Sequence, residues 1–147
     1  MPVTIHPDNG ITFPDNSVQP SSALYNRGNI VGAVSQVAGV PTGAVVESGA
    51  NGDGRWMRFA DGTQICYGAA DFSDSGWKTG SPAITYPNSF SAIPFTILSP
   101  FDDGTGYSTA IGISSRTTTT FTIRAAAGVS DSGTTVVIHF VALGRWF

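Results

Sequence analysis

The chain has 147 residues, which is enough for one ordinary domain or for one small domain with an arm. It contains 18 Gly and 9 Pro, many Thr, Ser, Val and Ile, and few Leu and Lys. This composition favours strands and excludes a helical bundle. Only 12% of the residues are charged and the net charge is -3, which excludes a nucleic-acid-binding stripe and indicates a surface partly covered in an assembly.

The first forty residues have weak and interrupted patterns. Two short strand-like pieces flank Asn9-Gly10, a strong turn signal, and Pro14 and Pro20 interrupt any regular element. Further along, repeated glycines lower the propensity of a short helix. We therefore predict an irregular N-terminal arm over residues 1–42 that needs a partner surface to be ordered. No basic segment precedes an apolar run, so we expect synthesis in the cytoplasm without a secretory signal.

Beyond the arm, the strand signals become dense. Asp61-Gly62 lies between two alternating runs, at residues 55–59 and 63–67, and this is the strongest short-range signal for a β-hairpin. The stretch 49–54, rich in Gly and Asn, is interpreted as a loop that precedes this hairpin.

More strand-like runs follow, separated by turn signals rich in Asp, Asn, Ser and Gly. They lie at residues 83–86, 95–99, 107–114, 119–125 and 135–143. Ser115-Arg116 is interpreted as one of the turns. Short strands at this spacing, with no helical periodicity, predict an all-β fold, an antiparallel six- to eight-stranded β-sandwich over residues 43–147.

The last predicted strand is apolar on both faces. Val137, His139, Val141 and Leu143 alternate with a second apolar set, so both faces need to be covered. One face can pack on the opposing sheet of the sandwich. For the other face we favour another subunit over the arm, and these four residues are the predicted subunit interface.

The sequence has no motif for covalent catalysis, a metal or a cofactor. His6 and His139 have no second ligand at metal spacing, and the single Cys66 is predicted to be buried and inert. Asp102 and Asp103 are adjacent and precede Gly, which is typical of a turn rather than of two catalytic acids. We expect no enzyme activity, no cofactor and no metal. Two alternatives remain open. Histidines from several subunits could together bind a metal, and carboxylates from several subunits could together form a catalytic site.

Three segments resemble bacteriophage tail-fibre proteins. Residues 11–16 (ITFPDN) resemble a segment near the start of domains in fibre proteins. Residues 52–66 (GDGRWMRFADGTQIC) resemble a hairpin of fibre tips, and residues 137–146 (VIHFVALGRW) resemble their C-terminal end. The resemblance implies a virion protein whose N-terminal arm attaches to other virion structural proteins.

The part from Gly76-Trp77 to the last strand is also similar to H-type lectins. These are antiparallel β-sandwiches that associate as trimers and bind sugars such as N-acetylgalactosamine, so the resemblance implies an H-type-lectin-like sandwich and a homotrimer. Their sugar pocket uses a Trp-His pair where this chain has residues 125–128 (AAAG), and a basic residue of the middle strand is replaced near Gly112. The sugar-binding residues of these lectins therefore do not carry over.

Two functions of different classes follow from these observations. The first is non-catalytic recognition of a host cell-surface polysaccharide or glycan by a trimeric tip, without nucleic acid and without membrane insertion. The candidate contacts are Trp77, Asp102, Asp103, Tyr107 and Arg116. Each has a structural alternative: a core position for Trp77, turn formation for the aspartates and a solvated turn for Arg116. The second function is purely structural, a collar, decoration or connector protein without receptor binding.

Overall fold

The computed structural model describes residues 3–6, 10–16, 18–19, 27–72, 82–101, 111–125 and 136–147. The elements are β1 (Thr4–His6), β2 (Gly10–Thr12), β3 (Val18–Gln19), α1 (Arg27–Ile30), β4 (Gln36–Val37), β5 (Val40–Pro41), β6 (Val46–Asn51), β7 (Gly54–Phe59), β8 (Thr63–Phe72), β9 (Ala83–Thr85), β10 (Phe95–Phe101), β11 (Ile111–Arg116), β12 (Thr120–Ala125) and β13 (Val136–Arg145). Apart from the single turn of α1, the elements are strands, and the predicted all-β class is confirmed.

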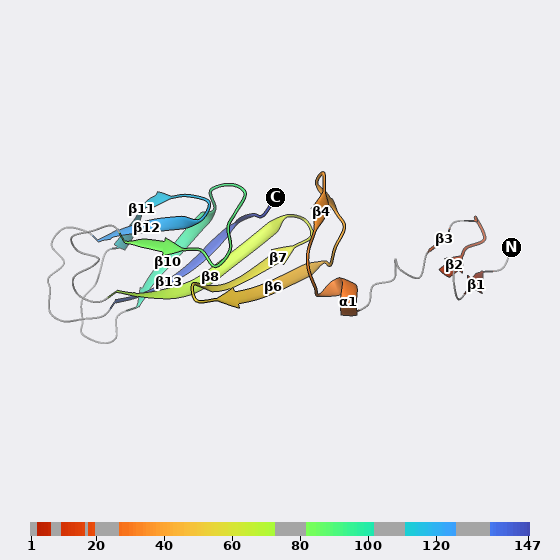
Figure 1. Ribbon diagram of the computed structural model, residues 1–147, viewed down its shortest axis with the longest axis horizontal. Coiled ribbons are helices and arrows are strands. Elements are labelled where there is room, and N and C mark those ends of the chain that lie inside the picture. Colours follow the sequence, from red (N-terminus) through yellow and green to blue (C-terminus); the bar gives the residue numbers. More distant parts are fainter. Residues whose placement is uncertain are drawn as a thin grey trace.

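Two antiparallel sheets pack face to face as a β-sandwich (Figure 1). One sheet has five strands in the order β10-β13-β8-β7-β6, and the other has three in the order β11-β12-β9. Strands adjacent in space are often distant in sequence, as where β13 lies between β10 and β8. The two sheets together form the predicted antiparallel sandwich.

The core lies between the sheets and is rich in aromatic rings. Phe121 is fully buried, and its ring centroid lies 5.2 Å from that of Phe140 on the opposite sheet and 5.3 Å from that of Tyr86. Tyr86 meets Phe90 edge to face at 5.2 Å. Such offset and edge-on contacts are the favoured geometry for aromatic pairs and add to the stabilisation from burial. They hold the strands of the small sheet on the large one.

The predicted Asp61-Gly62 hairpin is confirmed. β7 and β8 pair across it, the Gly62 amide donates to the Phe59 carbonyl at 3.0 Å, and Gly62 has a φ of +92°. This is a three-residue hairpin loop whose last position requires the left-handed conformation that glycine adopts at least cost. The Asp61 carboxylate accepts the Thr63 amide proton at 2.8 Å, and this hydrogen bond lowers the pKa of Asp61.

The prediction of a loop over residues 49–54 is wrong. Gly49 pairs with Trp56 inside the β6–β7 ladder, and the connection is reduced to Gly52 and Asp53. A Cβ on Gly49 would lie 2.5 Å from the indole ring of Trp56, so the glycine is there to admit that ring. A glycine that lets a side chain approach the backbone gives the same sequence signal as a loop glycine.

The interpretation of Ser115-Arg116 as a turn is also wrong. Both residues belong to β11, and the turn to β12 is made by the threonines that follow. The Thr117 hydroxyl accepts the amide protons of Thr119 and Thr120, at 3.2 and 2.9 Å, and so takes the role that Asp or Asn has in many turns.

Part of the predicted irregular arm is regular and attached to the large sheet. The Gly32 amide donates to the Val46 carbonyl and the Ala44 amide to the Ala33 carbonyl, both at 3.0 Å. Val34 and Ala44 are buried there, and the Glu47 carboxylate accepts the Val34 amide proton at 3.0 Å. Residues 29–46 are thus hydrogen-bonded to the start of the sandwich.

The N-terminal strands form a small meander, with β2 paired to β1 and β3. Its apolar side chains remain exposed: Ile5 at 76%, Val3 at 53% and Phe13 at 38%. A sheet of this size with an exposed apolar face needs a further surface to be stable. That residues 1–42 form an arm that requires a partner stays a prediction.

Candidate functional site

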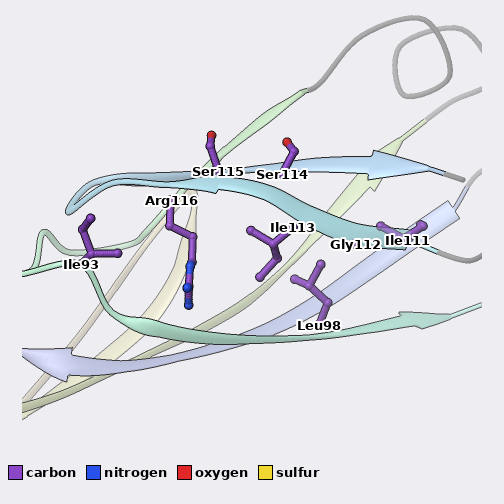
Figure 2. A pocket seen from close by; sticks show the side chains of 8 residues that line it. All are labelled: Ile93, Leu98, Ile111, Gly112, Ile113, Ser114, Ser115 and Arg116. Carbon is purple, nitrogen blue, oxygen red and sulfur yellow. The ribbon is translucent and has the colours of Figure 1, made fainter.

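An open pocket lies at one edge of the sandwich, where the edge strands β10 and β11 of the two sheets face each other. Its volume is about 630 Å³, within the range of small-molecule sites. We call it the edge pocket. Figure 2 shows its lining residues: Ile93, Leu98, Ile111, Gly112, Ile113, Ser114, Ser115 and Arg116.

The floor of the edge pocket is aliphatic. Leu98, Ile111 and Ile113 are partly buried and pack against the core, and in Figure 2 Leu98 and Ile113 lie between the two strands. Ile93, just before β10, is 62% exposed at the rim. A ligand in this pocket would meet an apolar surface on one side.

A β-bulge in β11 determines which side chains enter the pocket. Ile113 pairs with Ile123, but Ser115 rather than Ser114 pairs with Thr122, so two residues of β11 oppose one of β12. Both serine hydroxyls consequently lie on the outer face, where they meet the Thr122 hydroxyl at 2.7 and 2.6 Å. Figure 2 shows them pointing away from the pocket.

The same bulge turns Arg116 inward. Strict alternation from Ile111 and Ile113 would place Ser115 inside and Arg116 outside, whereas the bulge reverses the two. The guanidinium points into the gap between β11 and β10 (Figure 2), and Nη1 donates to the Pro94 carbonyl at 3.3 Å. Bulges commonly re-aim a side chain in this manner next to functional sites.

Arg116 brings a positive charge close to the buried edge of the core. Burial raises the pKa of Tyr86, whose hydroxyl is 2.7 Å from that of Thr96, and the charge of Arg116 opposes this shift. No Asp or Glu occurs in the described residues 82–101, 111–125 and 136–147, which supply β9 to β13. The strands around Arg116 therefore offer it no carboxylate.

Of the predicted glycan contacts, the structure describes Arg116 alone; Trp77, Asp102, Asp103 and Tyr107 lie outside the described residues. Arg116 is at the end of β11 near Pro94, whereas Asp102 follows β10 in the sequence. Phe101, at that end of β10, is seven residues from Pro94, about 23 Å along an extended strand. Arg116 is thus separated from the end of β10 that precedes the predicted aspartates.

The predicted interface residues Val137, His139, Val141 and Leu143 lie on the outer face of the five-stranded sheet. Alternate residues of β13, Ile138, Phe140 and Ala142, are buried in the core. Val141 and Leu143 are 48% and 47% exposed, and their cross-strand neighbours add Ile97, Phe95 and Tyr67 to the same face. We call these exposed side chains, Tyr67, Phe95, Ile97, Val141 and Leu143, the outer apolar face.

Residues 52–66 and the C-terminal end, which carry the tail-fibre resemblance, meet in the structure around Arg58. Its guanidinium lies 5.3 Å from the centre of the Trp56 ring and 5.4 Å from that of Trp146. Nε donates to the Gln64 side-chain oxygen at 2.8 Å and Nη2 to the Asn88 side-chain oxygen at 3.0 Å. These residues therefore form a scaffold that joins hairpin, C-terminus and the loop before β10.

Gln64 and Cys66 complete this scaffold from the inner face of β8, and both are fully buried. The Gln64 amide donates to the carbonyls of Asn88 and Ser89, at 3.2 and 3.0 Å. The predicted burial of Cys66 is confirmed, and this burial raises the pKa of its thiol to about 11, which keeps the thiol protonated at neutral pH. The sequence motif had no signal for this network, because Gln64 is polar and faces the core.

Within the part of the chain that is described, no three His, Cys, Asp or Glu side chains gather in a way that could hold a metal ion. Among the same residues, no helix has the length and apolar character needed to span a membrane.

The sequence matches no protein-family model and no curated protein. In structure, the chain is similar to an N-truncated R1-type pyocin tail fibre, with a TM-score of 0.51 and 17% identity over 69% of this chain and 88% of that one. It is also similar to a C-terminal part of the R1 pyocin fibre of P. aeruginosa, with a TM-score of 0.50 and 15% identity over 88% of this chain. There the match takes up 39% of the fibre chain. The predicted resemblance to tail-fibre proteins is thus confirmed at the level of the fold.

Proposed function

We propose that the chain is a receptor-binding component of a phage or phage-like tail fibre, which recognises a glycan on the host cell surface without catalysis. The observation that carries this proposal is the likeness of the sandwich to a pyocin tail-fibre piece, of which the match covers 88%. The residues around Arg58 that carry the tail-fibre resemblance hold the scaffold together, so we assign recognition to the edges and loops of the sandwich.

Assembly as a homotrimer is part of the proposal. The outer apolar face would be unusual on a monomer, since it gathers five exposed apolar side chains on adjacent strands. A second and third copy would cover it, and the predicted interface residues Val137, His139, Val141 and Leu143 belong to the same side of β13. Other virion proteins would bind the N-terminal meander, where Ile5 and Val3 are exposed.

Binding of labelled protein to bacteria tests the proposed function. A fluorescent fusion of the full chain should decorate cells of the host, and unlabelled protein should block adsorption of the phage or pyocin particle that carries it. The fluorescent partner alone and heat-unfolded protein serve as controls. Removal of surface polysaccharide from the cells, by mutation of its synthesis, should abolish decoration.

Each outcome decides between the two candidate functions. Decoration that survives loss of the polysaccharide would contradict glycan recognition and leave another surface receptor. No decoration and no competition would contradict receptor binding and leave the structural role in the virion. An Asp102→Ala/Asp103→Ala double variant tests the predicted loop separately: normal decoration by this variant would show that the aspartates are not contacts.

A further inference from the structure

We propose that the edge pocket is a subsite for an anionic saccharide, whose oxyanion pairs with the Arg116 guanidinium and whose apolar group packs on Ile111 and Ile113. The inference rests on the proposed glycan recognition and adds the chemical class of the ligand and the place where it binds. It commits to a sugar that carries both a negative charge and an apolar patch, such as a ring C–H face or a methyl group.

The orientation of Arg116 supports a binding site for an anion in the edge pocket. The bulge places both Ser114 and Ser115 opposite one residue, Thr122. As a result, Ser115 faces the outer side of the sheet and Arg116 faces the pocket. The hydroxyls of Ser114 and Ser115 are both satisfied by Thr122 on the outer face, at 2.7 and 2.6 Å, which holds the bulge in place. The backbone pairing therefore determines that Arg116 extends from the pocket side of β11, where its side chain is exposed.

The positive charge of Arg116 also supports an anionic ligand. Arg116 contributes a fixed positive charge to a lining that is otherwise aliphatic or hydroxylic. β9 to β13 supply no carboxylate among their described residues, and the contact of Arg116 with the Pro94 carbonyl is long, at 3.3 Å. A guanidinium has five N–H donors in a planar fork that fits a carboxylate or a phosphate. An anionic ligand would give the guanidinium a charged partner.

The third argument is the shape and surface of the pocket. Its volume of about 630 Å³ is suited to a sugar unit rather than to a single ion. The aliphatic floor of Leu98, Ile111 and Ile113 can bury the apolar side of a sugar while Arg116 orients its charged substituent.

A carboxylate and a phosphate share this chemistry, and a titration with three sugars distinguishes them. The probes are methyl β-glucuronoside, glucose 1-phosphate and the neutral methyl β-glucoside, added to the ¹⁵N-labelled full chain. The measured quantities are the NMR shifts of the Arg116 Nε–H group and of the β11 amides. We expect one or both anionic sugars to shift these signals, and the neutral sugar to have at least about tenfold weaker effect.

Two variants with a matched control test the role of the guanidinium. Arg116→Gln should weaken binding of the anionic sugar about tenfold or more, and Arg116→Lys should recover part of it because the charge remains but the fork is lost. Arg124→Gln removes the same charge from the neighbouring strand, where Arg124 is exposed like Arg116 but lies on the outer face, opposite Gly112. This control should change binding by less than about twofold. Unchanged amide spectra of β12 and β13 establish that each variant is folded.

Three results would overturn the inference: no shift of the Arg116 signals by either anionic sugar up to 50 mM, equal shifts by the neutral sugar, or equal losses in Arg116→Gln and Arg124→Gln. A pocket filled by a neighbouring copy would give the first of these.

The outcome for the edge pocket can be separated from the outcome for the proposed function. If wild-type protein and Arg116→Gln decorate cells equally, receptor binding stands and the edge pocket is not its subsite. If the sugars shift Arg116 but no cell is decorated, the pocket stands and the proposed function fails.

Discussion

Arg58 connects three segments that are far apart in the sequence. It lies between the rings of Trp56 and Trp146 and donates to the side chains of Gln64 and Asn88. Trp146 is itself held by a hydrogen bond from its indole N–H to the Phe59 carbonyl, 2.8 Å long. One cationic side chain thus fixes the C-terminal residues on the first hairpin of the sandwich.

Replacing Arg58 should therefore destabilise the fold. Arg58→Ala leaves the side-chain oxygen of the fully buried Gln64 without its donor and removes two cation–π contacts, so we expect a loss of about 2–3 kcal/mol in the free energy of unfolding. Arg55→Ala is the control on the same strand, because Arg55 is exposed, and it should change stability by less than about 0.5 kcal/mol. Urea unfolding followed by Trp fluorescence measures both. Equal losses in the two variants would contradict the role given to Arg58.

Because of Cys66, the free energy of unfolding should depend on pH in the alkaline range. Burial raises the pKa of its thiol from an ordinary value of 9.0 to about 11. Between these values the unfolded chain loses the thiol proton while the folded chain keeps it, so the free energy of unfolding falls as the pH rises. The expected loss from pH 9 to 11 is about 2 kcal/mol.

The Cys66→Ala variant isolates this contribution. Tyr86, whose pKa is also raised by burial, acts in the same direction, and it is present in both proteins. Subtracting the two unfolding curves, measured between pH 8 and 11, should therefore leave the slope due to Cys66. Parallel curves would show that the thiol does not contribute.

At the scale of the element, the β6–β7 hairpin depends on a glycine inside a strand. Gly49→Ala places a Cβ 2.5 Å from the Trp56 ring, which is packed on the core, so the ring or the strand has to move. We expect a loss of about 1–3 kcal/mol, as for other overpacked sites. Thermal unfolding measures it.

Gly52→Ala is the matched control, because a Cβ at Gly52, in the turn of the same hairpin, would meet nothing within 4 Å. It should be neutral or slightly stabilising, since alanine restricts the unfolded chain. If Gly52→Ala proves to be the more damaging variant, close approach of Trp56 is not the reason for Gly49.

At the scale of the whole molecule, the outer apolar face should decide the oligomeric state. We expect the wild-type chain to sediment as a trimer, in agreement with the proposed function. Val141→Asp/Leu143→Asp places two charges on this face and should give monomers. Ala83→Asp/Thr85→Asp, at two exposed positions on the outer side of the smaller sheet, should leave the trimer intact. Sedimentation that gives a wild-type monomer would contradict the assembly and leave the outer face for another partner.

The sequence alone determined the class of fold and its best-marked hairpin. Gly, Pro and β-branched residues exclude a helical bundle, the alternation of Phe121 and Ile123 with polar residues marks the buried face of β12, and Asp61-Gly62 marks a turn, because these signals are local. The position and orientation of the residues at the candidate site followed only from the tertiary structure. The register of β11 on β12 creates the bulge that turns Arg116 inward, and the approach of Trp56 converts Gly49 from a loop residue into a strand residue. Neither follows from local pattern, because a bulge and a close contact depend on the strand across the ladder. The low proportion of charged residues is reflected in the same structure, since the outer apolar face exposes apolar side chains on adjacent strands.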